Sequence, residues 1–277
     1  MSVIVVHFKI QYIARMALSK SNKTFVNAIF QSAVKSIQES NYDLRGLTKS
    51  KVEVGLTALL ATGLMASAPN FHAYVEVPTS ESIGTGLEDI RTNRDFKRKK
   101  EQTRSDLIVL NRHSPNWEKP EFYLEFKFKQ NYDLKWFNLE PKKEEREITL
   151  VNNYVENLGD LKKLSQFKES HQETICLQGF YICFNPESEK YEKKVGAPES
   201  NIAGFIRDYT KPELRASNHE IFLKSISGST DERVLSRRES LKDENLKTCE
   251  VEFCGDILIA QEEDFWLRLV LFEVTGH

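Results

Sequence analysis

The sequence predicts an α/β protein with a mixed central β-sheet flanked by helices, and three observations support this fold class. Apolar residues recur at helical spacing in residues 23–40 and about 49–66. Residues 73–77, 105–110 and 121–129 read instead as three strands. A further helix at about 148–167 and a strand at 174–184 then form a crossover, which places two strands parallel in one sheet. Helices on the faces of such a sheet define the α/β class.

Composition and charge narrow the class of protein. The chain has 277 residues, of which 40% are hydrophobic and 29% charged, as in ordinary globular proteins. The formal net charge is only −2, so any surface for a polyanion must be a local patch. Four cysteines are too few to staple a chain of this size, which predicts a reduced, cytoplasmic protein. No apolar run approaches the roughly 18 residues that span a bilayer, so we expect no membrane contact.

The two leading helices differ in pattern. The first has a wide apolar face that includes Phe25, Ile29 and Ile37. The second is apolar nearly all round and ends before Pro69, which cannot continue a helix. Glu53 is an acid in its first turns, among otherwise apolar positions.

The strands that follow are connected in two ways. A turn-rich connection with two prolines joins 105–110 to 121–129, which predicts an antiparallel hairpin. Beyond the crossover, residues 185–199 are predicted to be a loop, 227–245 a polar stretch that is helical or mobile, and 248–253, 255–260 and 265–274 strands. The predicted organisation is an N-terminal helical segment (residues 1–47), a core (48–184) and a C-terminal α+β extension packed on the core (185–277), rich in strands.

The third predicted strand carries residues whose side chains suit catalysis. Successive side chains of a strand point to opposite faces, so Tyr123, Glu125, Lys127 and Lys129 share one face. The opposite face is apolar and is predicted to pack under a helix. Asp106, near the start of the neighbouring strand, brings a second carboxylate to Glu125 and Lys127. One or two carboxylates suffice to hold Mg²⁺, and the lysine would stabilise charge on a phosphate, or position or deprotonate the attacking water.

These residues, Ser105-Asp106 and Glu125-Phe126-Lys127, resemble the motif of the PD-(D/E)xK nuclease superfamily, which includes many restriction endonucleases. The order of elements over residues 48–184 also resembles that family's core: a helix, three strands, a helix and a fourth strand. The resemblance implies that Asp106 and Glu125 bind Mg²⁺ or Mn²⁺, that the Phe126 carbonyl completes the coordination, and that Lys127 is catalytic. It implies a further acid from the leading helix, for which Glu53 is favoured and Glu76 is the alternative. Ser105 stands where the motif has proline.

The resemblance implies a nuclease acting on nucleic acid, with DNA favoured, a role in restriction or anti-phage defence, and a homodimer if both strands are cut. A basic block directly before Asp106 suits phosphate contacts, although a solvated charged face explains it equally well. The residues expected to contact nucleic acid are Arg91, Arg94, Lys97, Arg98, Lys99, Lys100, Arg104 and Lys129. Tyr132, Trp136 and Phe137 suit base stacking but are more typical of core packing.

Several alternatives stay open at this point. Glu125 and Lys127 would also fit a solvated strand face without catalytic function. The same fold would serve a non-catalytic module that binds nucleic acid or protein, and the same site would serve an enzyme that cleaves RNA. The four cysteines lack the usual spacing of a structural zinc site and are predicted to be buried free thiols. His113 is predicted to be a surface residue near the site.

Overall fold

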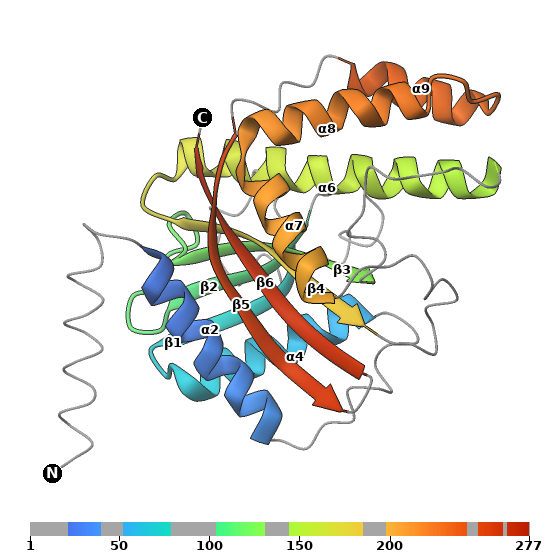
Figure 1. Cartoon of the computed structure of the whole chain (residues 1–277). Coiled ribbons are helices and arrows are strands. Elements are labelled where there is room, and N and C mark those ends of the chain that lie inside the picture. The colour runs from blue at the N-terminus through green and yellow to red at the C-terminus, as the bar shows by residue number, and fades with distance from the viewer. Residues whose placement is uncertain are drawn as a thin grey trace, which may run out of the picture.

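A computed structural model (Figure 1) describes residues 22–39, 52–78, 104–130, 144–184, 198–242, 249–262 and 265–276. These ranges contain both helices and strands. The elements in chain order are α2 (Asn22–Glu39), α4 (Val52–Ser67), β1 (Phe71–Pro78), β2 (Arg104–Asn111), β3 (Phe122–Gln130), α6 (Glu144–Ser170), β4 (Ile175–Phe184), α7 (Pro198–Thr210), α8 (Pro212–Ser225), α9 (Glu232–Leu241), β5 (Glu250–Glu262) and β6 (Phe265–Gly276).

The six strands form one mixed sheet in the order β1-β2-β3-β4-β6-β5. Strands β2 and β3 are antiparallel and β3 and β4 are parallel, which confirms the predicted hairpin and crossover. The remaining neighbours are antiparallel. The mixed α/β class is therefore confirmed, and the two C-terminal strands extend the same sheet beyond β4.

One face of the sheet is covered by α2 and α4. Alternate residues of β3, including Phe122, Leu124 and Phe126, lie in a buried apolar cluster with side chains of both helices. The two helices approach closely at Gly63, where an added Cβ would lie 2.3 Å from the Ala33 carbonyl oxygen. Only a residue without a side chain permits this crossing, so Gly63 fixes the packing of α4.

The opposite face is covered by α6 and α7. Its apolar cluster includes Tyr123 from β3, Phe180 from β4, Leu164 from α6 and Phe205 from α7. The predicted alternation of β3 is thus confirmed, because Tyr123 and Phe122 belong to clusters on opposite sides of the sheet.

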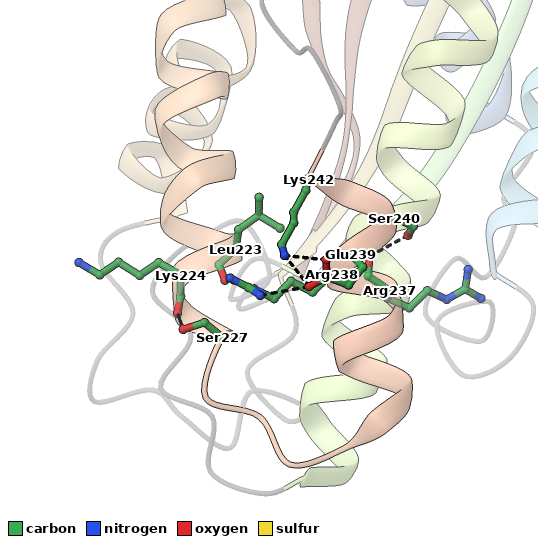
Figure 2. A network of polar contacts seen from close by, with 8 residues as sticks. All are labelled: Leu223, Lys224, Ser227, Arg237, Arg238, Glu239, Ser240 and Lys242. Atoms are coloured by element: carbon green, nitrogen blue, oxygen red, sulfur yellow. Dashed lines mark hydrogen bonds and ion pairs between the residues drawn. The ribbon is translucent and has the colours of Figure 1, made fainter.

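Beyond the sheet, α8 and α9 pack against α6 (Figure 1) around a small apolar cluster that includes Tyr154, Phe222 and Val234. Arg238 ties α9 to α8 by donating from Nε to the Leu223 carbonyl at 3.1 Å, and Figure 2 shows the surrounding polar contacts. This part of the fold was incompletely predicted. Helices α7 and α8 were not predicted, and α7 begins inside the range expected to be a loop.

The ends of these helices have local causes in the sequence. Pro212 stands at the start of α8, where its fixed backbone and missing N–H are tolerated. Asp231 caps α9 by accepting a hydrogen bond from the Arg233 N–H at 2.9 Å. Near the C-terminus, the two strands predicted at 248–253 and 255–260 are one strand, β5, with a register shift between Phe253 and Gly255. Among the described residues, no helix is long and apolar enough to cross a membrane.

Candidate active site

The candidate site lies where β2 and β3 separate. Their residues pair from Val109–Phe122 to Leu107–Leu124, and the pairing stops there. The last link between the two strands at this end is a side-chain hydrogen bond, in which the Ser105 hydroxyl donates to the Leu124 carbonyl at 3.1 Å. Past this fork, β3 keeps its pairing with β4 as far as Gln130. The backbone groups of β3 that face β2 must therefore find other partners.

Two carboxylates take the place of the missing strand pairing. The Phe126 N–H donates to Asp106 Oδ2 at 2.6 Å, and the Phe128 N–H donates to Glu53 Oε2 at 2.8 Å. Asp106 comes from β2 and Glu53 from the first turn of α4. Glu53, an acid in an otherwise apolar helix, thus contacts the end of β3, the strand that carries Glu125 and Lys127.

The charged face of β3 meets charged residues of α6. Lys163 Nζ lies 2.6 Å from Glu125 Oε1, and Lys127 Nζ lies 3.0 Å from Asp160 Oδ2. Glu125 is only 2% exposed. A solvated strand face with a Glu125–Lys127 or Glu125–Lys129 pair is therefore wrong, because α6 covers this face and supplies the ion-pair partners. We call Glu53, Asp106, Glu125, Lys127, Asp160 and Lys163 together the fork site.

Burial dominates the titration of the fork-site acids. It raises the pKa of Glu53 to about 7, although the charge of Lys127 and the Phe128 N–H oppose the shift. It raises the pKa of Glu125 to about 9 against the charge of Lys163. Burial also raises the pKa of Asp106 and of Asp160. Each of these acids is costly to ionise in the protein alone.

The pKa of Lys127 is also raised, but by neighbouring charges and not by burial. Burial by itself lowers its pKa, but the charges of Asp160 and Glu53 outweigh this effect and hold the pKa above its ordinary value. Lys127 therefore carries a positive charge at neutral pH. Of the roles open from the sequence, charge stabilisation and orientation of water fit this state, and proton abstraction does not.

Glu76, the alternative fourth acid, lies across β2 from the fork. It stands between the pairs Val75–Leu107 and Val77–Ser105, hence opposite Asp106, and its charge contributes to the raised pKa of Asp106. Its φ of 56° is left-handed, a conformation that costs a non-glycine residue about 1–3 kcal/mol. The side-chain alternation of β1 changes there, because Val75 packs on the α4 face and Val77 belongs to the α6 face.

The fork-site carboxylates fit a divalent cation by their chemistry. Asp106, Glu53 and Glu125 each engage one oxygen as above, and within the described ranges the other oxygen has no hydrogen-bond or ion-pair partner. The N–H and C=O of one strand residue point to the same side, so the Phe126 carbonyl also faces the fork. Four carboxyl groups stand against two ammonium groups, an excess of two negative charges when all are ionised.

The arrangement also limits what holds such a cation. In the part of the chain that the structure describes, no three or more His, Cys, Asp or Glu side chains are grouped so as to hold a metal ion. Mg²⁺ needs only one or two carboxylates because it keeps several waters. A pair of these acids with the Phe126 carbonyl would match that requirement in the number of ligands.

The predicted nucleic-acid contacts are only partly within the described residues. Arg91, Arg94, Lys97, Arg98, Lys99 and Lys100 lie outside them, as do Tyr132, Trp136 and Phe137. Arg104 begins β2, paired with Pro78. Lys129 is only 7% exposed, so its side chain presents little surface to a nucleic acid in this conformation.

Two further predictions concern His113 and the four cysteines, which were not assigned a functional role from the sequence. His113 is exposed, as expected, and its ring Nε2 lies 3.3 Å from Asn70 Oδ1. All four cysteines are buried free thiols, as predicted.

Asp160 and Lys163 are the fork-site residues that the sequence interpretation missed. They stand three residues apart on α6, beside the buried Leu161 and Leu164. A signal was present, since charged residues bordered the apolar stripe of a helix that follows the Glu-x-Lys strand. Glu53, by contrast, was favoured because the family resemblance implies an acid on the leading helix.

In comparisons with known proteins, no family model, no curated protein and no solved structure matches this chain. The site must therefore be interpreted from its own geometry.

Proposed function

We propose that this protein is a nuclease that uses Mg²⁺ or Mn²⁺ to hydrolyse phosphodiester bonds of nucleic acid, with DNA the favoured substrate. One observation carries the proposal: Glu53, Asp106, Glu125 and Lys127, separated by up to 74 positions in the sequence, gather at a fork in the sheet. Stability alone does not explain the fork site, because burying its four acids beside two lysines is expensive.

The order α4-β1-β2-β3-α6-β4 supports the same proposal. It is the order of elements implied by the resemblance to PD-(D/E)xK nucleases, with Glu53 on the leading helix and the Glu-x-Lys residues on the third strand. On this basis we propose a restriction-endonuclease-like core that acts in the cytoplasm, in restriction or anti-phage defence.

Each fork-site residue has a role in the proposed reaction. Asp106, with Glu53 or Glu125 and the Phe126 carbonyl, would hold the cation. A cation held there would supply Lewis acidity, drawing charge from a phosphate and lowering the pKa of a bound water. Lys127, held protonated by Asp160, would stabilise the negative charge that develops on the phosphate. Asp160 positions Lys127 and does not itself contact substrate in this scheme.

The test is cleavage of plasmid DNA, linear DNA and RNA by the full chain, with Mg²⁺, with Mn²⁺ and with EDTA. We expect DNA cleavage that EDTA abolishes, and a loss of about 10²–10³-fold in Lys127→Ala. Lys119→Ala is the matched control, because it removes an exposed lysine whose ion pair with Glu173 lies in the β2–β3 connection region. Circular dichroism establishes that both variants are folded.

The outcomes discriminate between the candidate functions. Lys127→Ala cutting as fast as the wild type would remove Lys127 from the mechanism. Cleavage of RNA alone would change the substrate and retain the site. No cleavage with any metal, together with metal-independent binding of nucleic acid, would favour a binding module.

A further inference from the structure

Lys163 holds a defined place in the fork site. Its ammonium group lies 2.6 Å from Glu125 Oε1 and 5.8 Å from the centroid of the Tyr123 ring. Only 21% of the Lys163 side chain and 3% of the Glu125 side chain are exposed. The lysine is thus held between a carboxylate and an aromatic face, which attracts cations. This is a fixed cation in a site where cations have a proposed role.

Glu125 contacts a cation through one of its two carboxylate oxygens. Its Oε1 is occupied by Lys163, whereas its Oε2 has no partner within the described ranges. In nuclease sites with two metals, about 3.5–4 Å apart, the ions act together on one phosphate. Here an ammonium group occupies one oxygen of the carboxylate.

We infer that Lys163 takes the place of a second metal ion, so that the fork site binds one divalent cation per chain. The inference rests on the proposed metal site and specifies its composition. Charge supports it: the acids exceed the lysines by two, which one divalent cation balances. A second divalent cation would bring this largely buried site to a net charge of +2 and would lie beside the Lys163 ammonium group, whereas without that ammonium group two cations leave a net charge of only +1.

The experiment counts bound Mn²⁺ on the full chain without nucleic acid, by calorimetric titration and by electron paramagnetic resonance of the free ion. Wild type is expected to bind one Mn²⁺. Lys163→Gln removes the ammonium charge and leaves a polar side chain whose neutral amide a divalent cation can displace from Glu125, so it is expected to bind two. Glu125→Gln combined with Lys163→Gln is expected to bind one again.

Two control variants keep the result interpretable. Lys162→Gln removes the neighbouring, exposed lysine of the same helix and is expected to bind one Mn²⁺. Lys163→Arg keeps the positive charge and is also expected to bind one. If Lys163→Gln does not fold, Lys163→Met preserves the packing of the aliphatic stem and is expected to bind two Mn²⁺.

The possible failures are distinct. Two Mn²⁺ bound to the wild type, or one Mn²⁺ bound to both neutral variants, would overturn the inference and leave the nuclease proposal intact. In the second case Lys163 would only neutralise Glu125. No Mn²⁺ bound to the wild type would overturn the metal site itself, and the inference with it.

Discussion

The two faces of the sheet bury very different chemistry at the same strand. On the α4 face, Phe122, Leu124 and Phe126 belong to a buried apolar cluster, in which Phe122 and Phe126 also contact aromatic rings. On the α6 face, Glu125 and Lys127 meet Lys163 and Asp160. The first face stabilises the fold by removing apolar surface from water. The second uses part of that stability to keep charges desolvated, which would strengthen their action on the phosphate of the proposed substrate.

The largest effect on stability is expected from the apolar face. Phe122→Ala removes a ring that contacts Phe25, Phe30 and Phe71, and should lower the free energy of unfolding by about 3–5 kcal/mol. Denaturant titration with the full chain measures this change. A loss below 1 kcal/mol would mean that this face does not dominate stability.

The charged face should instead make stability depend on pH. The pKa of Glu53 is about 7 in the folded protein against 4.5 ordinarily, so between these values the folded state holds a proton that the unfolded chain releases. The contribution of Glu53 to stability is therefore greatest below pH 4.5 and is lost as pH rises through 7, by up to about 3 kcal/mol.

Metal should reverse this loss, because a cation binds the ionised carboxylate. Thermal denaturation at pH 6 and pH 8 should show a larger rise in Tm with Mg²⁺ at pH 8. Glu53→Gln should reduce the difference between the two pH values. An equal rise at both pH values in the wild type would exclude Glu53 from metal binding.

A smaller effect on stability is expected from glycine substitutions, and it should differ between a helix on one face of the sheet and a helix on the other. Gly63→Ala, where α4 meets the backbone of α2, should destabilise the protein by about 1–3 kcal/mol through overpacking. Gly159→Ala on α6 is the matched control. Nothing lies within 4 Å of an added Cβ there, so it should be neutral or stabilise the helix by up to about 1 kcal/mol. Equal Tm values for the two variants would contradict the close crossing.

The sequence allowed most of the sheet to be predicted, because strand alternation and the crossover are local patterns with few topological solutions. It also identified Glu53, since one acid is conspicuous in an apolar helix. Asp160 and Lys163 were missed because α6 carries many charged residues, and periodicity alone does not determine which of them face the sheet. That choice depends on how α6 crosses the strands.

Helices α7 and α8 were missed for a different reason. Ile202, Phe205, Ile206 and Tyr209 have helical spacing in α7, but they follow a polar stretch that was interpreted as a loop. The register shift that joins two predicted strands into β5 depends on its pairing with β6, a contact absent from the local sequence.

The position of β4 between β3 and β6 has a consequence for synthesis of the chain on the ribosome. β4 is buried along nearly its whole length, and its second neighbour, β6, begins at Phe265, more than 80 residues after β4 ends. Until β6 emerges, one side of β4 lacks its strand partner and presents unpaired backbone groups, as an edge strand does. Pairing with β6 removes this edge, so chains interrupted before β6 should aggregate more readily than chains that include it.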